Sequence, residues 1–173
     1  MKVLLTSILC HSGLMTHVHD LIQYCQKSSI EVSAAFLKSE YATAEQAALL
    51  KAELGEIEIW EYEKDDELLE IVEESKCDLI HAHSFLTFNA ASNASRQLEV
   101  PLIITLHSVY LWGALYWEAL AQANRIIAVG PAQSRFLGPW TRKTVVIPNG
   151  VDLDKFKPGT FQNGEEVNVL WYG

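Results

Sequence analysis

The histidines of this chain are the side chains best suited to hydrogen-bond or proton-transfer chemistry near neutral pH. Six are present, at positions 11, 17, 19, 81, 83 and 107, and each lies in or beside the end of an apolar run that predicts a β-strand. His11, His83 and His107 follow three different runs. Because ligands of open α/β sheets bind beyond the carboxyl ends of the strands, we expect these three to face one crevice. Any one of them alone would be an ordinary surface or core histidine.

Ser12 and Gly13 follow the first predicted strand and open a predicted helix. A glycine lets backbone amides approach an anion closely, and the start of a helix favours negative charge. The pair does not form the Gly-x-Gly-x-x-Gly pattern of a dinucleotide site. Two interpretations therefore stay open, a simple tight turn and a contact with phosphate.

His81 and His83 are spaced so that they share one face of a strand, and this spacing also suits a pair of metal ligands. No cluster of Asp, His or Cys follows in the chain to complete a coordination set. A neutral imidazole serves equally well as a hydrogen-bond donor or an acid near pH 7. We therefore expect no metal site.

Strands and helices are expected to alternate strictly along the chain. The runs DLIHAH, PLIITLH and RIIAVG are continuously apolar, as in strands buried on both faces, whereas EIEIWEY alternates as at a sheet edge. The pattern predicts an α/β fold, a Rossmann-like, doubly wound parallel sheet. Strands are expected at 3–9, 31–37, 57–62, 78–81, 101–106, 125–129 and 143–147, and helices at 14–27, 43–54, 65–76, 85–98, 113–123 and 131–137.

A sharp turn ends the last of these strands. Proline cannot extend a central strand, and Asn-Gly readily adopts positive φ, so the sheet is expected to stop at Pro148, Asn149 and Gly150. A further strand is expected a few residues later, in VNVLWYG at 167–173.

The composition is that of a soluble globular domain. The chain has 173 residues, of which 49 % are hydrophobic and 20 % charged. Thirteen basic and twenty-two acidic residues give a net charge of −9, which argues against nucleic acid as a partner. Cys10, Cys25 and Cys77 are an odd, scattered set and indicate free thiols in a reducing compartment. This compartment is expected to be the cytoplasm, and no run of the sequence reaches membrane-spanning length.

Several segments together resemble the retaining glycosyltransferases of family four, which have the two-domain GT-B architecture. The resemblance spans residues 3–159, with its blocks in the family's order, and VVIPNGVDLDKFKP matches nearly residue for residue. Many members have Gly-Gly where this chain has Ser12-Gly13, and serine is usual in place of Gly130. The matching blocks are the Ser12-Gly13 loop with His17, CDLIHAH, PLIITLH, ANRIIAVG and VVIPNGVDLDKFKP.

The resemblance implies that the intact enzyme moves a sugar from a nucleotide-sugar donor to an acceptor (a glycan, lipid or small molecule) and retains the anomeric configuration. It implies His107 as the catalytic residue that contacts the donor sugar near the reacting carbon, with no cofactor beyond the donor as co-substrate and no essential metal. A membrane-linked acceptor would place the enzyme at the inner membrane face. The substrate-binding residues implied are Ser12, Gly13, His17, His83, Ser84 and Ser108.

The resemblance also implies a division into domains. Residues 1–150 would form an acceptor-side domain, 151–166 a linker, and 167–173 the first strand of a donor-binding domain that these residues do not contain. The hinge would comprise Pro148, Asn149, Gly150 and Asp152. That second domain of the same protein is then the main partner of this one, and the fragment alone is expected to be inactive.

Two other functions remain open at this point. A non-hydrolysing sugar-nucleotide epimerase shares the two-domain architecture, although the PNGVD segment favours the transferase. A non-catalytic, flavodoxin-like module would instead recognise a partner through its aromatic segment. That segment contains Tyr110, Trp112, Tyr116 and Trp117.

Overall fold

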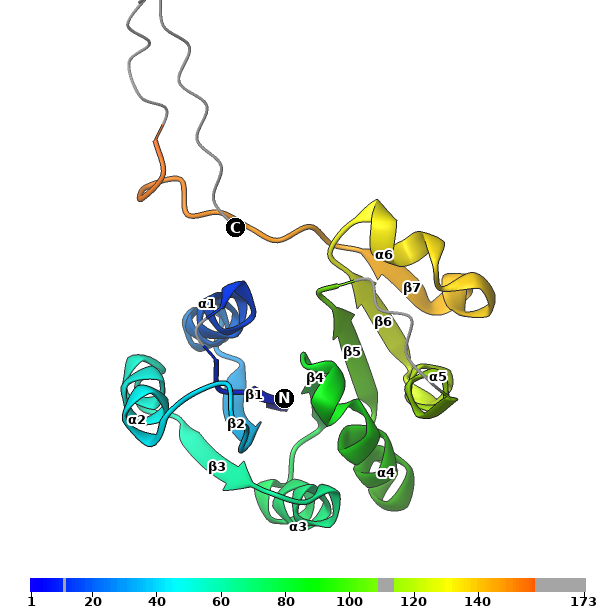
Figure 1. Ribbon diagram of the computed structural model, residues 1–173, viewed down its shortest axis with the longest axis horizontal. Coiled ribbons are helices and arrows are strands. Elements are labelled where there is room, and N and C mark those ends of the chain that lie inside the picture. Colours follow the sequence, from blue (N-terminus) through cyan, green and yellow to red (C-terminus); the bar gives the residue numbers. More distant parts are fainter. Residues whose placement is uncertain (11, 109–113, 158–173) are drawn as a thin grey trace, which may run out of the picture.

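The computed structural model describes residues 1–10, 12–108 and 114–157, and within them the chain forms one parallel sheet flanked by helices (Figure 1). The predicted α/β class is confirmed. The seven strands of this described part are β1 (Lys2–Ile8), β2 (Glu31–Leu37), β3 (Glu58–Tyr62), β4 (Leu79–Ala82), β5 (Leu102–Leu106), β6 (Arg125–Ala128) and β7 (Thr144–Val146).

The strand order is β3-β2-β1-β4-β5-β6-β7, and every neighbouring pair is parallel. The chain therefore winds outward from β1 to β3, returns to place β4 beside β1, and winds outward again to β7. The boundary between β1 and β4 is the switch point where ligands of doubly wound folds bind. As the alternation in its sequence predicted, β3 is an edge strand.

The helices cover both faces of the sheet, as the continuous apolar strands required. One buried cluster joins the sheet to α1 (Gly13–Lys27) and α2 (Ala44–Glu53). The other joins it to α3 (Asp65–Ser75), α4 (Phe88–Leu98) and α5 (Ala114–Gln122). Three shorter helices complete the described elements: η1 (Phe85–Thr87), α6 (Pro131–Arg135) and η2 (Gly138–Lys143).

Local sequence signals explain several helix ends. Thr43 and Gln46 form the expected capping box at the start of α2. Lys76 ends α3 in the left-handed conformation at φ 50°. The helix expected at 85–98 begins instead as the 3₁₀ turn η1, because the Ser84 hydroxyl accepts a hydrogen bond from Leu86 N.

A buried hydrogen bond ties the edge of the sheet to its centre. The hydroxyls of Thr6 on β1 and Tyr62 on β3 lie 3.0 Å apart, and both residues are buried. The intervening strand β2 places Ala35 in register with Thr6, and its small side chain leaves room for the tyrosine to pass. Burial raises the pKa of Tyr62 above its usual value, so its hydroxyl stays protonated.

After β7 the chain leaves the sheet as an exposed segment (Figure 1). Asp152 begins a turn, since its carboxylate accepts hydrogen bonds from the backbone N–H groups of Asp154 and Lys155. These bonds lower the pKa of Asp152. The strand expected at 167–173 lies outside the described residues, so the proposed domain boundaries stay a prediction.

All three cysteines are free and buried, as their spacing predicted. In the part of the chain that the structure describes, none of the helices combines the length and apolar character needed to cross a bilayer.

Candidate functional site

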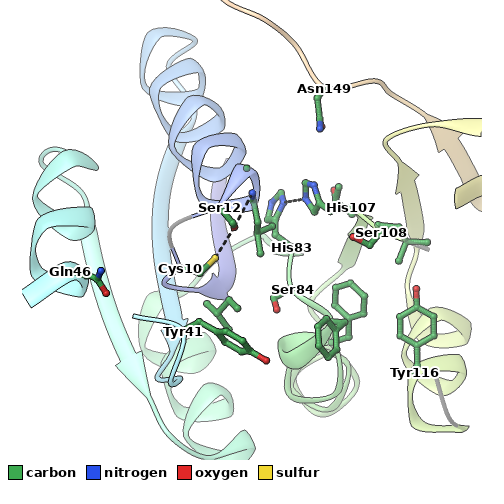
Figure 2. Close-up of a pocket in the computed structure, with 17 residues that line it drawn as sticks. Cys10, Ser12, Tyr41, Gln46, His83, Ser84, His107, Ser108, Tyr116 and Asn149 are labelled. Atoms are coloured by element: carbon green, nitrogen blue, oxygen red, sulfur yellow. Dashed lines mark hydrogen bonds between the residues drawn. The ribbon is translucent and has the colours of Figure 1, made fainter. Parts of the chain in front are cut away.

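A pocket of about 650 Å³ opens at the switch point of the sheet. Its walls come from the end of β1 and the start of α1 on one side, and from the ends of β4 and β5 on the other (Figure 2). Asn149, from the segment after β7, lies above its mouth. None of the described residues that line it is an Asp, Glu, Lys or Arg, although the chain carries a net charge of −9.

The loop after β1 presents the start of a 15-residue helix to this pocket. Ser12 is the N-cap of α1, and its Oγ accepts a hydrogen bond from Leu14 N at 3.3 Å. The Cys10 thiol lies 3.0 Å from the same Oγ. A Cβ added at Gly13 would meet no atom of the described residues within 4 Å, so the protein's own packing does not require a glycine there. The arrangement suits the approach of an anion to the helix start.

Three histidines from separate elements meet beside the pocket, and we call His17, His83 and His107 the histidine cluster. One ring nitrogen from each lies within 4.8 Å of those of the other two. The Nδ1 of His83 is 3.4 Å from the Nε2 of His107, and the ring centroids of His17 and His107 are 4.7 Å apart. The expected convergence of His83 and His107 is therefore observed, whereas His11 lies outside the described residues.

The period of the strands explains why these rings share a face. His81 and His83 are two residues apart on the chain leaving β4, and Thr105 and His107 are two apart at the end of β5. Side chains so spaced point to the same side of a sheet. Here that side faces α1, which supplies His17. His81 Nε2 lies 2.8 Å from Thr105 Oγ1, and the centroids of the His81 and His83 rings are 4.1 Å apart. The hydrogen-bonded pair of His81 and Thr105 therefore supports the cluster through His83.

Burial keeps these imidazoles neutral at pH 7. It lowers the pKa of His107 to about 4 and that of His81 to about 3, and it holds the pKa of His83 well below its ordinary 6.5. The pKa of His17 is also lowered by burial, which outweighs the raising effects of Asp20 and of a hydrogen bond with the Asn149 side chain. Each neutral ring therefore has one N–H donor and one nitrogen that can accept a hydrogen bond.

Two of the three serines implied by the resemblance, Ser84 and Ser108, differ in how much of their hydrogen-bonding capacity is already used. Ser108 is half-buried and lines the pocket. Ser84 also lines it but is buried, and it caps η1 through its Oγ while its carbonyl accepts from the Thr87 hydroxyl. The local structure thus already uses much of the hydrogen-bonding capacity of Ser84.

The four hinge residues Pro148, Asn149, Gly150 and Asp152 are all exposed. Asn149 lines the pocket and hydrogen-bonds His17, whereas Asp152 forms the turn described above. The segment therefore contributes the Asn149 side chain directly to the site, whereas the sequence indicated this segment only as a turn and a hinge.

Other lining residues were not predicted from the sequence. Tyr41 comes from the connection between β2 and α2 and Gln46 from the first turn of α2, and the sequence identified Gln46 only as a capping residue. Phe85, Phe88 and Tyr116 form the aromatic wall toward η1, α4 and α5, and of these the sequence had singled out only Tyr116, in its aromatic segment. Of the aromatic segment noted in the sequence, Trp117 stacks on Trp140 at 4.8 Å, and Tyr110 and Trp112 lie outside the described residues.

Solved structures share this architecture. Anabaena HepE, crystallised in complex with UDP and glucose, matches with a TM-score of 0.71 and 18% sequence identity over 92% of this chain and 47% of that one. The UDP-GlcNAc 2-epimerase of Neisseria meningitidis, bound to UDP-GlcNAc, matches with a TM-score of 0.64 and 16% identity over 84% of this chain and 45% of the other. The fold is that of one half of a GT-B protein.

Sequence comparison gives the family. The model of Glycosyltransferase Family 4 matches residues 11–155, and the chain belongs to that family. D-inositol 3-phosphate glycosyltransferase of Geodermatophilus obscurus is 31% identical over 102 residues, which cover 47% of this chain and 23% of that protein. The chain thus spans about a quarter of this relative and less than half of the solved structures above.

Proposed function

We propose that this chain is the acceptor-side domain of an enzyme that transfers a sugar from a nucleotide-sugar donor to an acceptor and retains the anomeric configuration. The observation that carries the proposal is the pocket at the switch point. It combines a helix start, neutral imidazoles and hydroxyls, and the described residues that line it carry no acidic group. Such a lining accepts a sugar and a diphosphate without charge repulsion.

His107 is the residue we assign to the donor sugar. Its imidazole is only partly buried and lines the pocket, and its lowered pKa of about 4 keeps it neutral. A neutral ring hydrogen-bonds a sugar hydroxyl next to the reacting carbon and adds no positive charge beside an oxocarbenium-like transition state. His83, which is buried against it, acts as a positioning residue for His107.

The start of α1 is assigned to the leaving phosphate. Negative charge grows on that group as the bond between the donor sugar and the phosphate breaks, and backbone amides at the start of α1, near Gly13, would stabilise this charge. Ser108, which lines the pocket, and His17, which lies beside it in the histidine cluster, are assigned to substrate hydroxyls. The nucleotide itself would be held mainly by the second domain, and we propose no cofactor or essential metal.

The test compares three proteins that each contain both domains. We expect His107→Ala to lower kcat/KM at least about 100-fold, in the range that a positioned catalytic group contributes. The matched control is His19→Ala, which removes an imidazole from the exposed side of α1, where it pairs with Asp20, and leaves transfer unchanged. Turnover of His107→Ala within a few-fold of the unaltered enzyme would remove His107 from the mechanism.

A second experiment tests the division of labour. Residues 1–173 alone are expected to show no transfer, because the donor-binding surface is supplied by the second domain. Measurable transfer by this fragment would contradict the two-domain proposal.

The epimerase alternative is favoured by one observation, the similarity of the fold to UDP-GlcNAc 2-epimerase. Membership of a glycosyltransferase family favours transfer. Product analysis separates the two functions: a transferase forms a new glycoside only when an acceptor is present, whereas an epimerase changes the nucleotide sugar with no acceptor.

A further inference from the structure

We propose that the histidine cluster of His17, His83 and His107 is a binding site for a transition-metal ion of the Zn²⁺ type, and that the bound ion blocks sugar transfer. In the sequence, His81 and His83 are spaced as a pair of metal ligands, but no further ligands follow them to complete a coordination set. The fold brings the other ligands from α1 and from the end of β5.

The geometry of the cluster suits such an ion. The 3.4 Å between Nδ1 of His83 and Nε2 of His107 is close to the about 3.3 Å that separates two nitrogens bound tetrahedrally to Zn²⁺ at about 2.0–2.1 Å. The ligand atoms of all three histidines lie within 4.8 Å of one another. To complete the set, the half-buried His17 ring has to turn inward and exchange its contact with Asn149 for the ion. Three nitrogens leave a fourth tetrahedral position for water.

The second nitrogen of the His83 ring is buried and has no partner among the described residues. His83 is only 2% exposed, and its Nε2 has no hydrogen-bond partner within residues 1–10, 12–108 and 114–157. A buried polar atom without a partner is costly, and nearly all such atoms in folded proteins are satisfied. Coordination through Nδ1 places the proton of the neutral ring on Nε2, so this nitrogen would need an acceptor from outside the described residues.

The chemistry of the ligands selects the type of metal. Imidazole nitrogens suit Zn²⁺, Co²⁺, Ni²⁺ and Cu²⁺, whereas Mg²⁺ prefers oxygen ligands in an octahedron. The site is therefore expected to ignore the Mg²⁺ that accompanies nucleotide sugars in solution.

Inhibition follows if His107 contacts the donor sugar, and this part of the inference rests on the proposed function. An imidazole that coordinates an ion no longer offers that nitrogen to a sugar hydroxyl. The ion would also place positive charge next to an oxocarbenium-like centre, where it destabilises the transition state. Metal binding itself requires only the geometry.

The binding test uses Co²⁺ as a spectroscopic probe on the purified protein, with Zn²⁺ as competitor. We expect the intense visible bands of tetrahedral Co²⁺, their loss when Zn²⁺ is added, and no effect of Mg²⁺. His17→Ala and His107→Ala are each expected to weaken binding by roughly tenfold or more. The control His19→Ala removes a histidine from the same helix as His17 and is expected to bind as the unaltered protein does.

Three results would overturn the site. One is a weak octahedral spectrum, another is unchanged affinity in both cluster variants, and the third is a thiolate-to-cobalt charge-transfer band, which would assign the ion to Cys10 at the pocket wall. Circular dichroism of each variant confirms that loss of binding is not loss of fold.

The transfer assay is a separate arm. We expect Zn²⁺ to inhibit the two-domain enzyme at the concentrations that displace Co²⁺, and a chelator to restore activity. Tetrahedral binding with unchanged transfer would overturn the inhibitory role and count against His107 at the reacting carbon, while the metal site itself would stand. Inhibition without Co²⁺ binding at the cluster would overturn the site but leave the proposed function intact.

Discussion

The Nδ1 of His83 lies 3.4 Å from the Nε2 of His107, so a buried ring at the end of β4 holds a pocket-lining ring at the end of β5. The contact joins two neighbouring strands whose residues are in parallel register, with His81 opposite Ile103. It fixes both the orientation of His107 and the nitrogen that remains for a substrate. The first prediction tests this relationship.

An amide at position 83 can replace the Nδ1 of histidine, whereas a leucine of similar size cannot. We expect His83→Leu to lower kcat by roughly 10-fold to 100-fold, because a misplaced catalytic group costs about this much. His83→Asn should retain most of the activity even though it fills the space less well. The measurement is steady-state transfer by the two-domain enzyme. Equal losses in both variants would show that His83 acts only through packing.

Stability is expected to fall as the pH drops below about 6.5. Burial lowers the pKa of His107 to about 4 and of His81 to about 3, whereas unfolded histidines titrate near 6.5. Between these values the unfolded chain binds more protons, so the free energy of unfolding decreases by up to about 1.4 kcal/mol per pH unit for each such histidine.

Urea denaturation at several pH values, with a chelator present, measures this slope. His107→Asn should reduce this pH slope by the contribution of up to one proton. His19→Ala serves as the control at a part-exposed position. A free energy of unfolding that is constant between about pH 7 and pH 5 would contradict the burial that lowers these pKa values.

The N-cap of α1 is expected to matter for stability through one hydroxyl. Ser12→Ala removes the acceptor for Leu14 N and should lower the free energy of unfolding by about 1 kcal/mol, whereas Ser12→Gly should cost only a few tenths. Chemical denaturation compares the two variants. If they lose equal stability, the Ser12 hydroxyl does not cap the helix in solution.

Asn149 is expected to influence donor binding more through charge than through its hydrogen bond. Asn149→Ala loses an exposed contact with His17 and should change stability by less than about 1 kcal/mol. Asn149→Asp places a carboxylate at the mouth of a pocket whose described lining has no acidic group, and should raise KM for the donor roughly tenfold.

KM for the nucleotide sugar, measured at low and high ionic strength, tests this difference. Repulsion between the new carboxylate and the diphosphate is screened by salt, so the effect should shrink at high ionic strength. An identical KM for the Ala and Asp variants would place the donor phosphates away from Asn149.

The Thr6–Tyr62 pair should anchor the β3 edge of the sheet. Tyr62→Phe leaves the buried Thr6 hydroxyl without its partner and is expected to lower the free energy of unfolding by about 1–3 kcal/mol. Thr6→Val in the same chain should recover part of this loss, because neither hydroxyl is then left alone. Additive losses in the double variant, measured by denaturation, would show that the two hydroxyls do not interact.

Much of the fold follows from local sequence. Continuous apolar strands and an edge strand with acidic alternation predict the doubly wound sheet, and the register of His83 and His107 follows from the period of two along their strands. Their convergence was predictable because the carboxyl ends of parallel strands meet at one edge.

The rest of the site depends on tertiary packing. His17 joins the cluster through the rotation of α1 on the sheet, which no strand period specifies. Tyr41 enters the pocket from the connection before α2 and Gln46 from the first turn of α2, so both depend on how α2 docks, and Asn149 enters it from beyond β7. The sequence around Trp117 is rich in aromatic residues, but its stacking partner Trp140 is distant in sequence. The stacking of these two rings therefore could not be predicted from either segment alone.

The return of the chain from β3 to the place beside β1 has a consequence for biosynthesis. Lys2 N donates a hydrogen bond to Asp78 Oδ2 across 76 residues. The pocket is lined by side chains that follow each of these two positions along the chain, such as Cys10 and His83. A ribosome-bound chain therefore cannot recognise any ligand through this pocket until His107 has left the exit tunnel, and a ligand can protect the nascent domain only after that moment.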